Sequence, residues 1–377
     1  MTSSAGLAVA VVGLRFGEEF LPIYHRHPDV TRVGVCDTDP ERLARVADRH
    51  GVRDRFDSLD EVLADERYAA VHLVSPVPRH ARQTLQVLRS GRHCACAVPM
   101  ATTLADLEEI IEAQRVAGTS YMMMETTLYG REYLYARALR DSGTLGRLSF
   151  LRGYHTQDLE GYPTYWWGFP PMHYATHALA PLLALADARA TSVRCLGSGR
   201  LPERLIRDYD NVFPVETAQF RLDRDELAAE VTMSFFRTGR AYQEGFSVYG
   251  EHASFEWEQL RDEGPARFTV LERPPGRRGR PIDQQRVELP DHADLLPPEI
   301  RRFTRPGCYD PGTGQPYAVR GAHGGSHPHL VHEFVRSALE GRRSAIDTVR
   351  AARWTAPGIC AHASAMREGE AQAVPHY

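Results

Sequence analysis

The chain has 377 residues, which at roughly 150 residues per domain corresponds to two or three domains. Its composition, 42% hydrophobic and 25% charged, is typical of a globular protein, and the formal net charge of −4 argues against a nucleic-acid or anionic-membrane partner. All 45 residues counted as Lys and Arg are arginine, which excludes a Schiff-base lysine and any lysine general acid or base.

The sequence also gives no sign of export, membrane insertion or structural disulfides. The six cysteines lack the spacing of a metal site or a disulfide framework, so we expect reduced thiols. No apolar stretch reaches the roughly 18–20 residues that span a bilayer, and residues 1–6 lack the charged segment of a secretory signal. These features predict a cytoplasmic protein.

The first third of the chain alternates short apolar segments with segments of helical periodicity. Asp39 and Gly51 stand where the N-cap and the C-terminal glycine of one such helix are expected. The alternation predicts βαβ units and a doubly wound parallel sheet. In chain order, the predicted strands are 7–13, 31–37, 69–75, 93–98 and 120–124, and the predicted helices are 18–27, 40–50, 80–90 and 104–117.

After Met124, strand-like segments follow one another without regular helices, which predicts an open, mainly antiparallel sheet. The predicted strands are 147–152, 218–222, 228–236, 246–249 and 253–257, and closing helices are predicted at 329–341 and 348–367. We interpret the stretch from about 272 to 328, rich in Pro, Gly and Arg, as a loop that covers the site.

The fold class is therefore α/β, with two expected domains. Residues 1–124 are expected to form a Rossmann domain, and residues 125–377 a substrate-binding α+β domain whose final helices are candidates to pack back on the first.

The turn after the first strand is a candidate phosphate-binding turn. A dinucleotide fold needs glycine here and a helix N-terminus that faces the pyrophosphate. Gly13 fits the first position of G-x-G-x-x-G, whereas Arg15 and Glu18 occupy the other two. We expect Gly17 to replace one glycine through a shifted turn, and Arg15 to supply positive charge beside the phosphates.

Asp37 ends the second predicted strand, where a carboxylate would accept hydrogen bonds from the ribose hydroxyls. The same carboxylate would repel a 2′-phosphate, so the sequence favours NAD over NADP. The alternative interpretation is an aspartate that only caps the strand.

Four segments are similar to the glucose–fructose oxidoreductase/inositol dehydrogenase (Gfo/Idh/MocA) family. They are VAVVGLRFG at 9–17, VSPVPRH at 74–80, GRHCACAVP at 91–99 and HEFVRSALEGR at 332–342. The resemblance implies a Rossmann domain, a second domain with an open antiparallel sheet, and a homo-oligomer formed through that sheet. It assigns the NAD site to Gly13, Arg15, Phe16, Gly17, Asp37, Ser75, Pro76, His80, Val98 and Pro99.

Two departures from the family pattern bear on the chemistry. Family dehydrogenases carry E-K-P, whose lysine assists proton transfer, whereas this chain has Ala97-Val98-Pro99. The family motif D-x-G-x-H-x-x-D retains only His177 here. An ordinary sugar dehydrogenase mechanism therefore lacks its usual acid/base partner.

The departures resemble one branch of the family, the NAD-dependent glycosidases typified by α-N-acetylgalactosaminidases, to which NAD-dependent sulfoquinovosidases are related. The branch has V-P where this chain has Val98-Pro99, and M-M-E-N-x-x-Y-G-R-E where this chain has the segment 123–132. It also has Y-P-T-H and G-H-G-G, where this chain has the segments 174–177 and 322–325.

This resemblance implies oxidation of sugar carbon 3, loss of the carbon 2 proton, elimination at carbon 1, water addition and hydride return. Histidine is the side chain whose ordinary pKa suits the base. We assign the proton transfers to His177 and Tyr174, which would share one face of a helix, and add Glu125 as a third catalytic residue.

Substrate contacts are expected from polar and aromatic residues in the matching segments, and no metal site is predicted. The alternative for His155 and Asp158 is that they only shape the loop after the strand. The alternative for Trp167 is that its ring only fills apolar space beneath the covering loop. The expected substrate residues are Tyr129, Arg131, His155, Asp158, Trp167, His173 and His323.

Three functional hypotheses follow. The first is a redox glycosidase acting on a small sugar or glycoside. The second is an NAD-dependent sugar or cyclitol dehydrogenase that uses His177 in place of lysine. The third is a catalytically silent sugar–nucleotide sensor, suggested by the incomplete glycine motif.

Overall fold

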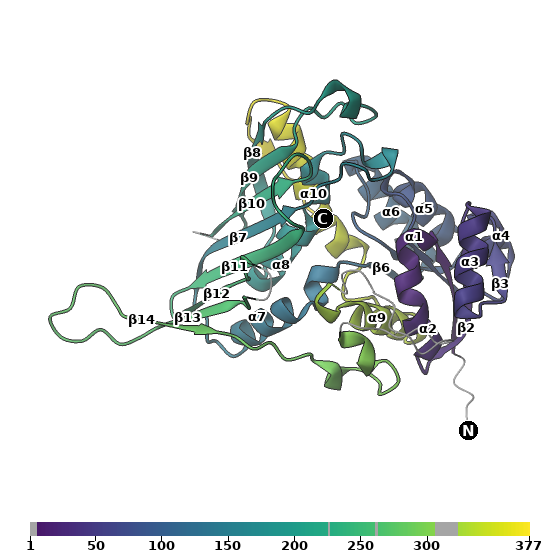
Figure 1. Ribbon diagram of the computed structural model, residues 1–377, viewed down its shortest axis with the longest axis horizontal. Helices are drawn as coiled ribbons and strands as arrows, with labels where there is room; N and C mark the ends of the chain where they lie inside the picture. The colour runs from purple at the N-terminus through teal and green to yellow at the C-terminus, as the bar shows by residue number, and fades with distance from the viewer. Residues whose placement is uncertain (1–5, 225–226, 261–262, 306–322) are drawn as a thin grey trace. The chain divides into compact units, whose positions relative to one another are not determined.

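The computed structural model describes residues 6–224, 227–260, 263–305 and 323–377. The chain divides by its internal contacts into two compact units (Figure 1). Unit 1 comprises Met1–Gly130 and Asp291–Ala352, and unit 2 comprises Arg131–Pro290 and Arg353–Tyr377. The division of the chain into folding domains at residues 1–124 and 125–377 stays a prediction.

Unit 1 is built on a six-stranded parallel sheet with the order β3-β2-β1-β4-β5-β6. Every residue of β1 is buried, as expected for a strand covered on both faces. Strand order reverses between β1 and β4, so the carboxyl ends of these strands form the edge where doubly wound sheets bind nucleotides. The strands are β1 (Leu7–Val12), β2 (Val30–Cys36), β3 (Asp54–Phe56), β4 (Ala70–Leu73), β5 (His93–Cys96) and β6 (Tyr121–Met123).

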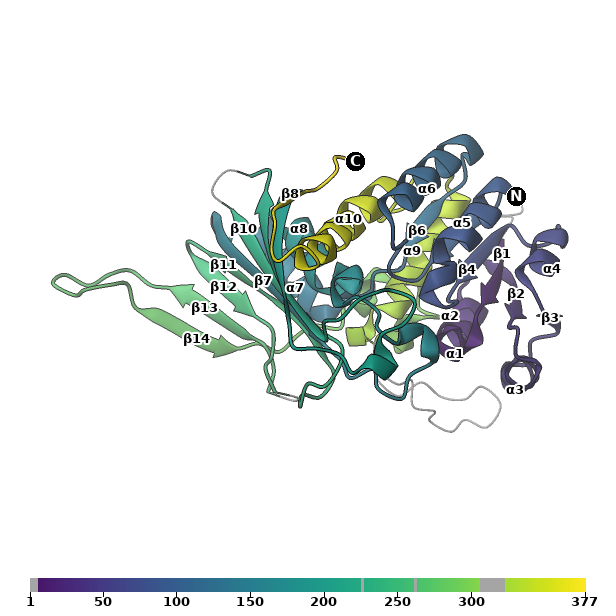
Figure 2. The same ribbon diagram turned by 90° about the horizontal axis from the view of Figure 1, so that it is seen from above.

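Helices cover both faces of this sheet (Figure 2). As predicted, Asp39 caps α3 by accepting from the backbone N–H groups of Glu41 and Arg42, and Gly51 ends the helix at a φ of 64°. The predicted helix 18–27 instead begins as a 3₁₀ helix at Glu18–Phe20 and continues as α2 from Leu21. The helices are α1 (Leu14–Gly17), α2 (Leu21–Arg26), α3 (Pro40–His50), α4 (Leu59–Ala64), α5 (His80–Arg89), α6 (Leu104–Ala117) and α9 (His327–Leu339).

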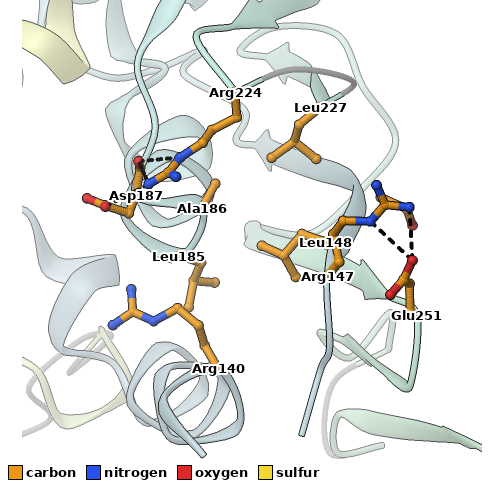
Figure 3. A pocket seen from close by; sticks show the side chains of 10 residues that line it. Arg140, Arg147, Leu148, Leu185, Ala186, Asp187, Arg224, Leu227 and Glu251 are labelled. Carbon is orange, nitrogen blue, oxygen red and sulfur yellow. Dashed lines mark hydrogen bonds and ion pairs between the residues drawn. The ribbon is translucent and has the colours of Figure 1, made fainter. Parts of the chain in front are cut away.

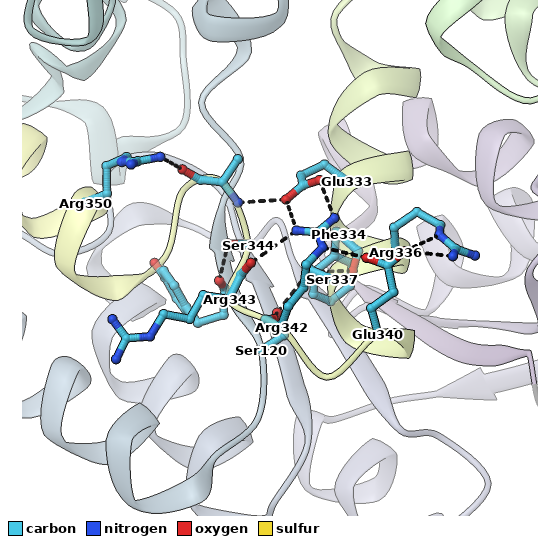
Figure 4. A network of polar contacts seen from close by, with 12 residues as sticks. Ser120, Glu333, Phe334, Arg336, Ser337, Glu340, Arg342, Arg343, Ser344 and Arg350 are labelled. Atoms are coloured by element: carbon cyan, nitrogen blue, oxygen red, sulfur yellow. Dashed lines mark hydrogen bonds and ion pairs between the residues drawn. The ribbon is translucent and has the colours of Figure 1, made fainter. Parts of the chain in front are cut away.

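A polar network ties the late segment of unit 1 to the early sheet (Figure 4). Ser120, just before β6, contacts the Ser337 hydroxyl on α9 at 2.9 Å, and the Ser344 hydroxyl donates to the carbonyl of Tyr121 at 2.6 Å. Arg342 pairs with both oxygens of Glu333 at 2.7 and 2.8 Å. Residues more than 200 positions apart in the sequence therefore form one structure.

Unit 2 contains a nine-stranded sheet with the order β14-β13-β12-β11-β7-β10-β9-β8-β15. Its described pairs are antiparallel except β7 with β10, which are parallel, so the predicted mainly antiparallel sheet is confirmed. The strands are β7 (Leu148–Thr156), β8 (Ala190–Ser198), β9 (Val215–Leu222), β10 (Ala228–Ser234), β11 (Gln243–Gly250), β12 (Ala253–Glu256), β13 (Ala266–Val270), β14 (Ile282–Arg286) and β15 (Gln372–Ala373).

Helix α8 (Thr176–Ala186) packs on β7, β10 and β11, and α7 (Arg131–Asp141) packs against α8. Gly153 in β7 permits this packing, because a Cβ atom there would lie 2.3 Å from the carbonyl oxygen of Ala178. Helix α10 (Thr348–Ala365) begins in unit 1 and runs from Arg353 onward in unit 2.

The loop predicted for residues 272–328 is wrong over its first part. The pair β13–β14 forms a hairpin whose connection projects from the sheet (Figures 1 and 2), with residues 271–280 exposed. Pro and Gly here lie in the turn that leads into β14, a mostly polar and exposed strand that hydrophobic periodicity does not detect. Residues 306–322 of the predicted loop lie outside the described residues.

Two composition-based expectations can be compared with the described residues. Cys36, Cys94, Cys96, Cys195 and Cys360 are buried and form no disulfide in the described part of the chain, and Cys308 lies outside it. Among the described helices, we find none with the length and hydropathy that a bilayer span requires.

Candidate active site

The turn between β1 and α1 is shaped by two glycines. Gly13 has a φ of 92°, and a Cβ atom there would lie 2.5 Å from the carbonyl oxygen of Val74. At Gly17, a Cβ atom would lie 2.9 Å from Cγ1 of Val11. Gly13 thus allows close approach of the turn to the backbone after β4, and Gly17 allows close packing of α1 on β1, the two roles that glycines have in a dinucleotide-binding turn. Arg15, between them, is exposed.

Asp37 links the end of β2 to both neighbouring helices. One carboxylate oxygen accepts from the backbone N–H of Leu14 at 2.8 Å, and the other from that of Asp39 at 2.9 Å. The guanidinium of Arg42 lies 2.9 and 3.1 Å from the two oxygens. Because Arg42 places a cation at the same corner, the preference for NAD over NADP stays a prediction.

His80 joins the segments that follow β4 and β5. Its Nδ1 lies 2.8 Å from the carbonyl oxygen of Pro99, and its Nε2 lies 2.8 Å from that of Ser75. Carbonyl oxygens only accept, so both contacts are satisfied by the doubly protonated imidazolium. Burial lowers the pKa of His80, but the side chain of Cys96 and the two carbonyls raise it to about 9. The predicted cofactor residues Ser75, Pro76, Val98 and Pro99 are thereby held at the carboxyl edge of the sheet.

The remaining predicted residues of unit 1 have aromatic or capping contacts. His323 lies 5.9 Å from Phe16 between ring centroids, and Tyr129 stacks on His329 at 6.4 Å. Glu125 is fully buried and accepts from the backbone N–H and the hydroxyl of Thr127 at 3.2 and 2.9 Å. Among the described residues, no group of three or more His, Cys, Asp or Glu side chains is arranged to hold a metal ion.

Unit 2 brings five side chains into one group, which we call the carboxylate–histidine cluster: His155, Tyr174, His177, Tyr242 and Glu244. The two histidines and the glutamate are buried, Tyr174 is partly buried and Tyr242 is exposed. One oxygen of Glu244 lies 3.8 Å from Nδ1 of His155 and 3.9 Å from Nδ1 of His177. The same oxygen accepts a 3.0 Å hydrogen bond from the hydroxyl of Tyr242. The two imidazoles stack at 5.5 Å, and Tyr174 meets His177 edge-on at 4.8 Å.

Burial gives this cluster its chemical character. His155, His177 and Glu244 are exposed by only 1%, 4% and 8%. Two imidazoles and a carboxylate shielded from water in this way provide groups that can accept and release protons.

Glu244 was missed by sequence analysis, as was its neighbour Glu132. Burial, together with the charges of Glu244 and Glu258, raises the pKa of Glu132 on α7 to about 7. With a pKa of about 7, Glu132 is about half protonated near pH 7, so it places less negative charge beside Glu244 than an ordinary glutamate would.

The sequence predicted that Tyr174 and His177 lie on one helix, but in the structure they belong to two different helices. Tyr174 ends a 3₁₀ helix, Pro171–Tyr174, whereas His177 is the second residue of α8. Pro170 and Pro171 start a separate short turn, because proline favours the first positions of a helix. The two side chains nevertheless meet edge-on, and their assignment to the proton transfers stays a prediction.

The other predicted substrate residues lie in different surroundings. Asp158 is exposed and accepts from the backbone N–H of Glu160, and Trp167 donates to the carbonyl of Tyr162 while Arg207 covers its ring at 4.7 Å. His173 packs against His362 at 5.0 Å. Arg131, half-buried, begins α7.

Unit 2 also has a hollow of about 780 Å³ lined by three arginines (Figure 3). Arg147 pairs with Glu251 at 3.0 Å and Arg224 with Asp187 at 2.8 Å, while Arg140 donates to the carbonyl of Ala184. Because carboxylates and a carbonyl already face these guanidinium groups, and no member of the carboxylate–histidine cluster lines the hollow, we assign it no part of the site.

The parallel sheet, the glycine turn and the carboxyl-edge contacts of unit 1 define an NAD-binding Rossmann domain. Residues 7–125 match the family model described as "Oxidoreductase family, NAD-binding Rossmann fold". This segment of the chain is a domain of the Gfo/Idh/MocA family.

Curated relatives include both redox enzymes and glycosidases. A 1,5-anhydro-D-fructose reductase of Ensifer adhaerens is 32% identical over 33% of this chain and 37% of its own length. A glycosyl hydrolase family 109 protein of Stenotrophomonas maltophilia is 26% identical over 41% of this chain and 36% of its own length. An inositol 2-dehydrogenase of Rubrobacter xylanophilus is 24% identical over 67% of this chain and 72% of its own length. The first of these matches thus spans well under two thirds of the relative.

Solved structures extend the likeness of fold to nearly the whole chain. Levoglucosan dehydrogenase in complex with NADH and levoglucosan has a TM-score of 0.77 at 18% identity, with 98% of this chain and all of that chain covered. A myo-inositol 2-dehydrogenase from Lactobacillus plantarum has a TM-score of 0.71 at 16% identity. At these identities the likeness concerns the fold.

Proposed function

We propose that the protein is an NAD-dependent glycoside hydrolase that works by transient oxidation at sugar carbon 3. The observation that carries the proposal is the carboxylate–histidine cluster, which offers a base without lysine. A sugar or glycoside is the substrate, in keeping with the relatives' printed names.

The cofactor fits the chain's residues. Gly13 and Gly17 let the β1–α1 turn pack closely against Val74 and Val11 at the carboxyl edge of the sheet, Asp37 follows β2 at the same edge, and His80 fixes the segments after β4 and β5. Bound NAD supplies an acceptor for the hydride of carbon 3 and returns it at the end of the cycle.

The side chains of unit 2 move the protons in this proposal. Tyr174, acting as its phenolate, takes the proton from the carbon 3 hydroxyl as the ketone forms and becomes a neutral hydroxyl, and Nε2 of His177 takes the acidified proton from carbon 2. Glu244, aligned by Tyr242, stabilises the resulting imidazolium. The glycosidic oxygen at carbon 1 then leaves, water adds, and the proton transfers reverse.

A net sugar or cyclitol dehydrogenase is the second candidate. The inositol 2-dehydrogenase relative, which matches over the largest share of this chain among those named here, favours it. The same cluster would serve a single oxidation, so only the fate of the hydride separates the two functions.

The test is turnover of a panel of p-nitrophenyl α- and β-glycosides in deuterated water with NAD supplied. The glycosidase predicts released nitrophenol, deuterium at carbon 2 of the product sugar and no accumulation of NADH. Accumulation of NADH in amounts equal to an unlabelled ketone identifies the dehydrogenase. Cleavage without deuterium at carbon 2 contradicts both.

A further inference from the structure

A second buried carboxylate of unit 2, Glu216, lies outside the carboxylate–histidine cluster. It belongs to β9, where alternate residues face the interior, and its partners in that alternation are Ala218, Phe220 and Leu222. Glu216 is fully buried. A charge at such a position is costly unless it is hydrogen-bonded, so its partners are informative.

Both oxygens of Glu216 have a donor. One oxygen accepts from the backbone N–H of Met172 at 2.8 Å, and the other lies 2.7 Å from Nδ1 of His362 on α10. Met172 belongs to the 3₁₀ helix that ends at Tyr174 and leads directly into His177. Glu216 therefore holds the segment that carries both proposed proton-transfer residues.

Helix α10 contributes to the same anchor from a second position. A Cβ atom at Gly358 would lie 2.2 Å from the carbonyl oxygen of Met172, so only glycine permits this approach. Gly358 and His362 are four residues apart and share one face of the helix. On one face of α10, Gly358 therefore packs against the backbone of Met172, and His362, one turn later, bonds the second oxygen of Glu216.

We propose that Glu216 and His362 are positioning residues that fix segment 171–178, and with it Tyr174 and His177, in the reactive arrangement. This inference rests on the proposed function for its catalytic consequence. The anchor acts through its two hydrogen bonds. A shift of about 1 Å in a catalytic group can lower turnover by roughly 10².

The test compares Glu216→Ala, Glu216→Gln and a matched control, Ser364→Ala. The Ser364 hydroxyl accepts from the backbone N–H of Cys195 at 2.9 Å, so the control removes another buried bond between α10 and the sheet without touching Met172. Glutamine at 216 can accept from Met172 and donate to the other tautomer of His362, which preserves both bonds without the charge.

Two readouts are measured: amide hydrogen exchange of segment 171–178, and kcat and KM with NAD supplied. For Glu216→Ala we expect exchange to rise at least about tenfold and kcat to fall at least about tenfold, with KM within about threefold and NAD retained. Glu216→Gln and Ser364→Ala should stay within about threefold of the unmodified protein in both readouts.

Unchanged exchange in Glu216→Ala overturns the proposal, and a Glu216→Gln variant as inactive as Glu216→Ala overturns it in favour of a role for the charge. If Glu216→Ala does not fold, His362→Ala, which removes one of the two bonds, must show the same rise in exchange. Exchange does not require substrate. A rise in exchange in a protein that cleaves no glycoside therefore leaves the anchor standing and refutes only the proposed function.

Discussion

The hydroxyl of Tyr242 donates a 3.0 Å hydrogen bond to the oxygen of Glu244 that faces both His155 and His177. This bond fixes which carboxylate oxygen meets the two imidazoles. It also explains how residues of a strand and a helix share one negative charge, since β7 and β11 are paired and α8 packs across both.

The charge of Glu244 should therefore set the pH range of the reaction. Removing it in Glu244→Gln lowers the pKa of the histidine base, because an adjacent anion favours the imidazolium. We expect the acidic limb of kcat/KM to move to lower pH by about one unit, and kcat to fall by about 10². Tyr242→Phe, which keeps the charge, is the control, and an acidic limb that stays in place would exclude Glu244 as the partner of the base.

Although the rings of His177 and His155 stack, substitutions of the two histidines should change different kinetic constants. If His177 is the base, His177→Asn lowers kcat by about 10² or more while bound NAD is retained. If His155 contacts the sugar, His155→Asn mainly raises KM. Steady-state kinetics together with mass spectrometry of co-purified NAD check both, and near-normal kcat in His177→Asn would remove it from the mechanism.

Asp37 should affect the two dinucleotides unequally. Asp37→Ala removes an acceptor for the ribose hydroxyls and leaves Arg42 to face a 2′-phosphate, so NAD affinity should fall at least about tenfold more than NADP affinity. Asp39→Ala, which removes the α3 cap at the same corner, controls for local destabilisation. Equal losses for both dinucleotides in calorimetric titrations would make Asp37 a purely structural link.

Glu132 should destabilise the fold at high pH. Its pKa is raised from 4.5 to about 7, with burial the largest cause, so the folded state binds a proton more tightly than the unfolded state. The stability that this protonation contributes is complete below pH 4.5 and is lost as pH rises through about 7. Glu132→Gln should match the unmodified protein near pH 4 and exceed it above pH 8 by up to about 3 kcal/mol. Denaturant unfolding at both pH values measures this, and a constant difference would refute it.

Five of the six strands of unit 1 could be predicted because each contains a short apolar run such as Leu7–Val12. Strand β3 was missed, because Asp54–Phe56 is only three residues long and begins with two charged residues. Strand β14 could not be predicted, since Ile282–Arg286 is mostly exposed and polar and forms by pairing with β13 alone. Tertiary pairing, not local preference, decides such edge strands.

The site was predictable in its histidines but not in its carboxylates. His155 and His177 lie in segments that match family motifs. Glu244 is a single acidic residue near the start of β11, in no recognisable motif, and its partner His177 is distant in sequence. Glu216 did carry a local signal: it occupies an inward position of an alternating strand, where a charged residue demands a buried partner. Nothing in the sequence identified that partner as His362.

The network between Ser120, Ser337 and Ser344 has a consequence for biosynthesis. The edge of the parallel sheet at β6 is translated early, but the helix and loop that engage it come from residues beyond 326. On the ribosome, all of the nine-stranded sheet except β15 emerges before that partner exists. The nascent chain therefore carries an incomplete nucleotide-binding half, with its β6 edge unpaired by α9, through most of its synthesis.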